Sequence, residues 1–202
     1  NISNEEVTGL PVMQFSGRII VVDGPDGLED ACRDLLSHPA VGFDTETRPS
    51  FKAGVVNRVA LLQLSTPDTC YLFRLCKMPL ERAIQKVLES KSTRKIGAAI
   101  RDDIRALQSL RRFRPGGFED LQGMICDWGV AEKSVRKMAG IVLGGRVSKA
   151  QRLSNWEAGN LTPAQQLYAA TDAWVCLGIY QRLARTDRKA LTPTVVKAVD
   201  KT

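Results

Sequence analysis

Val41-Gly42-Phe43-Asp44-Thr45-Glu46-Thr47 is the stretch on which the fold of this chain depends. Its small and apolar start predicts a strand in the protein interior, and side chains on a strand alternate between its two faces. One face therefore carries Gly42, Asp44 and Glu46, and the other carries Val41, Phe43 and Thr45. Two carboxylates aimed at one place need a cation or open water beside them. An Asp-x-Glu pair at a strand end is weak evidence for a metal by itself, so the other motifs decide between the two.

Size and charge indicate one domain with a negatively charged partner. The chain has 202 residues, of which 44% are hydrophobic, enough for one sizeable core. We predict a single domain with its core over residues 18–186, an irregular N-terminal extension over 1–16 along the surface, and a peripheral tail over 187–202. Lys and Arg total 29 against 22 Asp and Glu, and the resulting formal charge of +7 suits a polyanion such as nucleic acid.

The cysteines and the hydropathy pattern indicate a cytoplasmic protein. No Cys-x-x-Cys pair of the kind that binds zinc occurs, so we expect the five cysteines to be small core residues in a reducing compartment: Cys32, Cys70, Cys76, Cys126 and Cys176. No apolar run approaches the roughly 20 residues that span a bilayer, and the first residues are polar and acidic rather than a signal sequence.

Strand and helix patterns alternate along the rest of the chain. A first strand over 18–22 precedes a helix that Asp26 is predicted to cap, with Glu29 in the capping-box position. Two apolar runs at 59–64 and 70–73 flank a Pro-Asp turn and predict a hairpin. We expect further helices over 80–89, 100–110, 122–128 and 134–143, short strands over 95–99 and 118–121, and a long final helix capped by Thr162, with Pro163 in its first turn.

Two of these helices carry inward-facing acids. Asp103 lies one turn before Leu107 on the core stripe of its helix, whereas Asp102 faces a more polar side. The alternative is that both acids serve only as favourable charges at a helix N-terminus. On the final helix, Tyr168 and Asp172 are four residues apart and share the apolar stripe, where a lone carboxylate needs a partner. Tyr168 alone could equally be an ordinary core tyrosine.

Together, four acids point inward: Asp44, Glu46, Asp103 and Asp172. Their charge would be balanced by two divalent cations, and hard carboxylate oxygens suit Mg²⁺ or Mn²⁺ rather than Zn²⁺. Two such ions about 4 Å apart commonly activate water against a phosphodiester. A basic chain with this set of acids is therefore interpreted as a nuclease.

Three motifs resemble those of the DEDD superfamily of 3′-5′ exonucleases, in the same order. They are Phe43-Asp44-Thr45-Glu46, Lys95-Ile96-Gly97 followed by Asp103, and Tyr168-Ala169-Ala170-Thr171-Asp172-Ala173. The Tyr-x-x-x-Asp form of the third motif is that of the tyrosine subclass, DEDDy. Ser154-Asn155-Trp156 and the residues up to Asp172 are most similar to Werner-type exonuclease domains, and ribonuclease D is a more distant relative. The resemblance runs from about Ile19 to Leu183.

The resemblance implies an α/β fold like that of ribonuclease H, with a mixed central sheet of five to six strands flanked by helices. It implies that Asp44 bridges two metal ions, Glu46 and Asp172 complete one metal site, and Asp103 holds the second ion. Tyr168 would orient and help deprotonate the attacking water. The histidine subclass uses a histidine there, but the only histidine of this chain, His38, precedes the first motif and is expected to be structural.

Basic residues near these motifs are candidates for binding nucleic acid. Lys149 and Arg152 match basic positions that precede the Ser-Asn-Trp stretch of Werner-type domains, and Asn155 lies within that stretch. Arg48 and Lys52, just after the first motif, are further candidates, as is a second patch at Arg111, Arg112 and Arg114. The alternative for all of them is a solvated basic surface.

The resemblance implies a 3′-5′ exonuclease that releases nucleoside 5′-monophosphates, with two Mg²⁺ or Mn²⁺ ions and no nucleotide cofactor. DNA is the preferred substrate because the motifs are nearer to the Werner type, and trimming of RNA 3′ ends is the enzymatic alternative. An inactive scaffold that binds nucleic acid is an alternative of another class. No membrane partner is expected, and the sequence names no protein partner.

Overall fold

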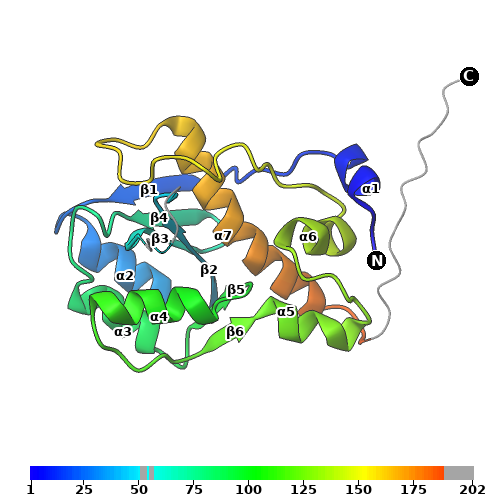
Figure 1. The fold of residues 1–202 in the computed structure, drawn as a ribbon. Helices are drawn as coiled ribbons and strands as arrows, with labels where there is room; N and C mark the ends of the chain where they lie inside the picture. Colours follow the sequence, from blue (N-terminus) through cyan, green and yellow to red (C-terminus); the bar gives the residue numbers. More distant parts are fainter. Residues whose placement is uncertain (51–53, 55–56, 189–202) are drawn as a thin grey trace, which may run out of the picture.

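A six-stranded mixed sheet forms the centre of the protein (Figure 1). The computed structural model describes residues 1–50, 54 and 57–188. The strands run in the order β1-β4-β3-β2-β5-β6, and β3 is antiparallel to both of its neighbours while the other pairs are parallel. They span β1 (Arg18–Val22), β2 (Ala40–Thr47), β3 (Val59–Ser65), β4 (Thr69–Phe73), β5 (Arg94–Gly97) and β6 (Phe118–Asp120). The predicted mixed α/β architecture is confirmed.

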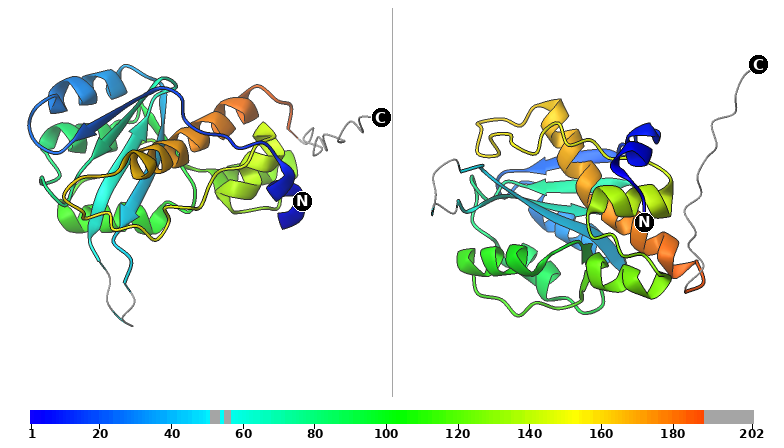
Figure 2. Two further views of the ribbon diagram at one scale, coloured as in Figure 1. Left: turned by 90° about the horizontal axis from the view of Figure 1, so that it is seen from above. Right: turned by 45° about the vertical axis from the view of Figure 1, so that its right-hand side comes forward.

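Helices cover both faces of the sheet (Figure 2). They are α1 (Asn4–Gly9), α2 (Leu28–Leu36), α3 (Arg82–Glu89), α4 (Arg101–Leu110), α5 (Leu121–Met124), the 3₁₀ helix η1 (Ile125–Trp128), α6 (Val135–Leu143) and α7 (Pro163–Ala184). The long helix α7 crosses one face, with α6 and α1 beyond it, and α2 and α3 lie on the other. Among the described residues, no helix is both long and apolar enough to cross a membrane.

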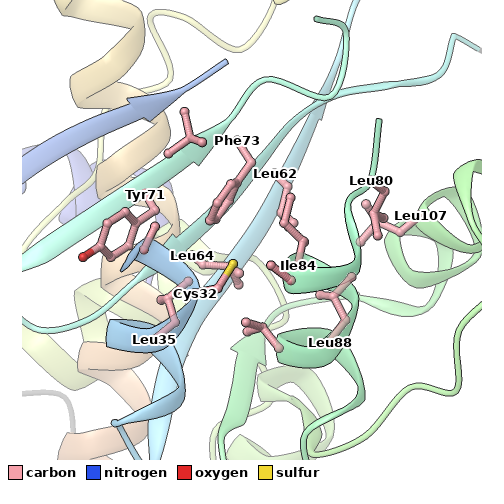
Figure 3. Packing of buried hydrophobic residues seen from close by; sticks show 14 of the residues in the cluster. Cys32, Leu35, Leu62, Leu64, Tyr71, Phe73, Leu80, Ile84, Leu88 and Leu107 are labelled. Atoms are coloured by element: carbon pink, nitrogen blue, oxygen red, sulfur yellow. The ribbon is translucent and has the colours of Figure 1, made fainter. Parts of the chain in front are cut away.

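The core on the α2 and α3 side is built from alternate residues of the strands. Figure 3 shows Leu62 and Leu64 of β3 and Tyr71 and Phe73 of β4 packing with side chains from the helices, including Leu35, Ile84 and Leu88. Every residue of β3 and β4 is buried. Because both faces of these strands are covered, they form continuous apolar runs in the sequence instead of an alternating pattern.

Helix α7 lies unusually close to β2 because residue 42 is a glycine. A Cβ atom added at Gly42 would lie 1.9 Å from the carbonyl oxygen of Ala173 and 3.4 Å from Cβ of Leu177. The helix presents the small buried residues Ala169, Ala170 and Ala173 in this region. Since Gly42 shares its strand face with Asp44 and Glu46, the same close approach sets the acids of β2 against α7.

The N-terminal residues are more ordered than the sequence suggested. They were expected to be an irregular surface extension, but residues 4–9 form α1, which begins with a capping box between Ser3 and Glu6. Ile2, Val7 and Phe15 are buried. A helix of six residues buries a single side chain of its own, so no repeating apolar pattern marks it in the sequence.

Two further local predictions are wrong. Asp26 does not cap α2: the N-cap is Gly27, in a left-handed conformation with φ 72°, and no side chain caps this end. A glycine adopts this conformation at little cost and starts the helix after Pro25. Cys76 and Cys126 are exposed rather than in the core, because they lie just after β4 and within η1. Residues 189–202 of the predicted tail lie outside the described residues.

We predict that Gly42→Ala destabilises the fold by about 1–3 kcal/mol, the usual cost of overpacking, because the added methyl collides with backbone that cannot move alone. Urea denaturation measures the change. Gly123→Ala in α5 is the matched control, since nothing lies within 4 Å of its added Cβ. If both variants unfold at the wild-type urea concentration, the contact between α7 and β2 tolerates a side chain.

Candidate metal centre

Three of the predicted acids meet where β2 ends under α7. Each of Asp44, Glu46 and Asp172 offers a carboxylate oxygen, and these oxygens lie within 4.8 Å of one another. Strand alternation brings Asp44 and Glu46 to one face, and the close approach at Gly42 brings Asp172 of α7 to the same place. Residues more than 120 positions apart in the sequence therefore form one cluster.

Asp103 reaches this cluster from the opposite face of the sheet. It lies in the first turn of α4, and its Oδ1 accepts a hydrogen bond of 2.5 Å from the hydroxyl of Thr45. Gly97 lets β5 turn tightly into α4, because a Cβ there would lie 2.5 Å from Ile100 and 2.9 Å from the carbonyl oxygen of Phe43. Thr45, which faces away from the other acids, thus holds the fourth acid at the end of the strand.

Burial and mutual repulsion make the acid cluster costly without a cation. The pKa of Asp44 is raised well above its ordinary value by burial and then by the charges of Asp172 and Asp103. Burial and the neighbouring Asp44 raise the pKa of Glu46 to about 9. Burial also raises the pKa of Asp172 and that of Asp103. A divalent cation would offset the repulsion between the carboxylates and favour their charged form. Carboxylate oxygens are the donors that Mg²⁺, Mn²⁺ and Ca²⁺ prefer. The cluster therefore fits a divalent metal site.

Tyr168 lies one helical turn before Asp172 and beside the buried ring of Trp156. The two ring centroids are 6.0 Å apart, and the Tyr168 side chain is partly buried. Its pKa is raised by burial, by the charges of Asp172 and Glu46, and by a hydrogen bond with Asp172. In the metal-free chain the hydroxyl is therefore protonated at neutral pH and can donate a hydrogen bond.

A cavity of about 160 Å³ joins the acids to a basic wall. Asp44, Tyr168 and Asp172 line it, and so do Lys149 and Arg152, the residues of the basic wall. The structure thus brings these two predicted basic residues to the acids. Arg136, in the first turn of α6, also lines the cavity. The sequence analysis did not identify Arg136 as a candidate. Only its position two residues after the helix cap Ser134 distinguishes it from other surface arginines.

The segment that carries Lys149 and Arg152 is fixed at its far end by Arg74. This buried arginine, just after β4, donates through Nη2 to the carbonyl oxygen of Ala158. Trp156, two residues earlier, is fully buried. The polar connector is therefore attached to the sheet where it enters the turn before α7.

The remaining predicted residues do not line this cavity in the described part of the chain. Arg48 forms an ion pair of 3.4 Å with Glu157, and Asn155 Oδ1 accepts a hydrogen bond of 3.1 Å from the backbone N–H of Glu157. Their roles in binding nucleic acid stay predictions. Lys52 lies outside the described residues.

The other basic candidates and the histidine lie elsewhere. Arg112 and Arg114 line a separate cavity beside Glu89, and Arg111 donates to the carbonyl oxygen of Leu80. His38 Nδ1 lies 2.8 Å from the carbonyl oxygen of Asp34, at the end of α2. This local contact suits the structural role expected for it.

Gln63 is a buried polar residue with no counterpart in the sequence analysis. It lies opposite Asp44 in the pairing of β2 with β3, so the two side chains share a face. Its side chain is fully buried, and within residues 1–50, 54 and 57–188 neither its amide nitrogen nor its amide oxygen has a hydrogen-bond partner. A buried amide without a partner is costly, and the strand register places it beside Asp44 of the acid cluster.

Comparison with protein families matches residues 19–186 to the family described as 3′-5′ exonuclease. Among individual proteins, the chain is similar to the bifunctional 3′-5′ exonuclease/ATP-dependent helicase WRN of Mus musculus, with 36% identity over 186 residues. The match covers 86% of this chain and 13% of the mouse protein. The chain therefore spans only a small part of that relative.

Solved structures share the fold at lower sequence identity. The Nibbler EXO domain of Aedes aegypti has a TM-score of 0.77 at 23% identity, covering 86% of this chain and 92% of that chain. Escherichia coli RNase D has a TM-score of 0.74 at 22% identity, covering 84% of this chain and 44% of that chain. These likenesses confirm the predicted ribonuclease H-like arrangement of sheet and helices.

We predict that the metal-free chain loses stability as the pH rises. Because the pKa of Glu46 is raised from 4.5 to about 9 in the folded state, the folded chain binds a proton that the unfolded chain releases between these values. The stability contribution of Glu46 is therefore fully present below pH 4.5 and is lost as the pH rises to about 9. Melting temperatures in EDTA should fall over this range, and the increase caused by Mn²⁺ should grow with pH. Glu46→Gln should flatten the EDTA curve. An Mn²⁺ effect that is equal at both ends of the range would contradict this electrostatic account.

We also predict opposite effects of Gln63→Met on stability and on metal binding. Removing a buried amide that lacks a partner should raise the free energy of unfolding in EDTA by about 1 kcal/mol, measured in urea. If the amide supports Asp44, Mn²⁺ affinity should fall about 10-fold or more in calorimetric titration, as for lost outer contacts in other metal sites. Unchanged Mn²⁺ affinity would make Gln63 a packing residue only.

Proposed function

Because this chain belongs to the 3′-5′ exonuclease family, we propose that it hydrolyses phosphodiester bonds at nucleic-acid 3′ ends and releases nucleoside 5′-monophosphates. The observation that carries this proposal is the meeting of three carboxylates from β2 and α7 within 4.8 Å, two of which, Asp44 and Asp172, line a cavity that basic residues also line. The acids suit metal ions, and the basic wall suits the phosphates of the substrate.

We assign the acids to two divalent cations, Mg²⁺ or Mn²⁺. Asp44 is central in the cluster and would contact both ions, Glu46 and Asp172 would complete one site, and Asp103 would serve the other. The separate position of Asp103, held by Thr45, supports this division. When bound, such ions supply positive charge that activates water and stabilises the leaving oxygen.

The protein groups around the ions orient the reactants. We assign the hydroxyl of Tyr168, which hydrogen-bonds with Asp172 and lines the same cavity, to orienting the attacking water. Lys149 and Arg152 line the same cavity and would hold substrate phosphates against the acids. Trp156 packs beside Tyr168 and limits the positions that its ring can take.

DNA is the substrate that we favour, because the motifs are nearer to the Werner type and one relative with 36% identity is the WRN protein of mouse. Trimming of RNA 3′ ends is the alternative. It is favoured by the fold shared with E. coli RNase D, which is described as an exoribonuclease involved in structured RNA processing. Contacts to the sugar 2′-hydroxyl decide between the two.

Mononucleotide release from matched DNA and RNA strands in Mg²⁺ tests this proposal. We expect wild-type protein to shorten DNA faster than RNA from the 3′ end. Asp44→Asn should reduce release by about 10²-fold or more, the scale on which a lost electrostatic stabiliser acts. Tyr168→Phe should also reduce it, by about 10²-fold, since it removes a polar catalytic group.

Asp102→Asn is the matched control, because Asp102 is exposed on the same helix as Asp103. It should retain wild-type activity, and circular dichroism should show that all variants are folded. Faster release from RNA would replace DNA by RNA in the proposal. Absence of release with either Mg²⁺ or Mn²⁺ would overturn the enzymatic assignment and leave a nucleic-acid-binding scaffold.

A further inference from the structure

We propose that Arg136 binds a substrate phosphate and that the N-terminal segment, residues 2–15, holds the basic wall in position. This inference rests on the proposed exonuclease function. Arg136 lines the cavity that also contains Asp44 and Asp172, and its side chain is partly buried. It comes from α6, whereas Lys149 and Arg152 come from the connector that follows this helix.

The guanidinium of Arg136 is held by α1. Its Nη2 donates a hydrogen bond of 2.9 Å to Thr8 Oγ1. No carboxylate lies within ion-pair distance of it in the part of the chain that the structure describes. A guanidinium has five N–H donors in a planar fork, so donors remain for the oxygens of a phosphate.

The same N-terminal segment also holds the start of the basic connector. Arg146 donates from its backbone N–H to the carbonyl oxygen of Pro11 at 2.9 Å and from Nε to that of Leu10 at 3.1 Å. Met13 N–H in turn donates to the carbonyl oxygen of Arg146 at 2.8 Å. Arg146 lies three residues before Lys149, so this pairing fixes where the connector begins.

The segment is finally attached to the helix that carries the acids. The N–H of Phe15 donates a hydrogen bond of 3.1 Å to Thr171 Oγ1, next to Asp172 in α7. The Phe15 ring lies 6.0 Å from that of Trp174. One short segment thus ties α6, the connector and α7 together, and these elements carry the basic wall and Asp172. Figure 1 shows the segment running from α1 past α6 to α7.

The positioning role of residues 2–15 does not follow from the family match, because the match begins at residue 19. Another explanation is that Arg136 only offsets the charge of Asp44 and Asp172 through space. The two explanations differ in what they predict. A phosphate contact contributes to substrate affinity and its salt dependence, whereas charge balance within the protein affects the acids and hence the rate.

The test compares Arg136→Gln, Arg136→Lys and Thr8→Val with a matched control, Arg33→Gln. Arg33 is an exposed arginine of α2 that pairs with Asp30 and lies away from the cavity. Binding of a fluorescent oligonucleotide in Ca²⁺, followed by anisotropy at several salt concentrations, gives affinity separately from hydrolysis. KM and kcat in Mg²⁺ complete the comparison, and circular dichroism checks that each variant is folded.

We expect Arg136→Gln to weaken binding and raise KM by about 10-fold, with kcat much less affected, because it removes a charged hydrogen bond to the substrate. The slope of log affinity against log salt should fall by about 0.7–0.9, the contribution of one phosphate contact. Arg136→Lys should lie between wild type and Arg136→Gln. Thr8→Val should weaken binding by a few-fold, because the arginine loses its support.

Unchanged affinity and salt slope in Arg136→Gln would overturn the phosphate contact, and a fall in kcat alone would favour charge balance. If Arg136→Gln weakens binding but Thr8→Val does not, the positioning role of the N-terminal segment is wrong. Failure of the wild-type protein to release nucleotides would overturn the proposed function, while the binding measurements in Ca²⁺ would still decide the role of Arg136.

Discussion

The close contact between α7 and β2 is the constraint on which the rest of the site depends. Side chains normally separate packed elements of secondary structure, and stacked sheets lie about 10 Å apart for this reason. At Gly42 there is no side chain, and the backbone of Ala173 occupies the space that one would fill. The residue before Ala173 is Asp172, so the depth at which the helix packs also sets how near its carboxylate comes to Asp44 and Glu46. Packing and chemistry are determined by the same pair of backbones.

This arrangement is energetically unfavourable because it gathers like charges in a buried site. Burial raises the pKa of each of the four acids, and the charges of neighbouring acids of the cluster raise those of Asp44 and Glu46 further, so the metal-free site opposes folding at neutral and higher pH. The basic residues of the cavity stand opposite the acids and form no ion pair with them in the described residues. Functional sites often retain such unfavourable features because the ligand compensates for them. In the proposed function, the compensating ligands are divalent cations for the acids and substrate phosphate for the basic residues.

Much of the site could be predicted because its residues follow regular periods. Strand alternation placed Asp44 and Glu46 together, helical spacing placed Tyr168 above Asp172, and the capping box at Thr162 marked the start of α7. What could not be predicted depends on contacts between distant segments. The bond from Thr45 to Asp103 joins β2 to α4, and the bond from Arg136 to Thr8 spans 128 residues. The N-cap of α2 is Gly27 because of its left-handed backbone conformation. The sequence does not reveal this conformation, and Asp26 with Glu29 matched the pattern of a capping box instead.

The connector between α6 and α7 is attached at both ends, to the N-terminal segment through Arg146 and to β4 through Arg74. A chain with fixed ends has few conformations to lose when a ligand immobilises it. Lys149 and Arg152 are thus carried on a segment that is anchored at both ends, instead of on a segment with one free end. Ligand binding to a segment held in this way should cost less conformational entropy than binding to a free arm.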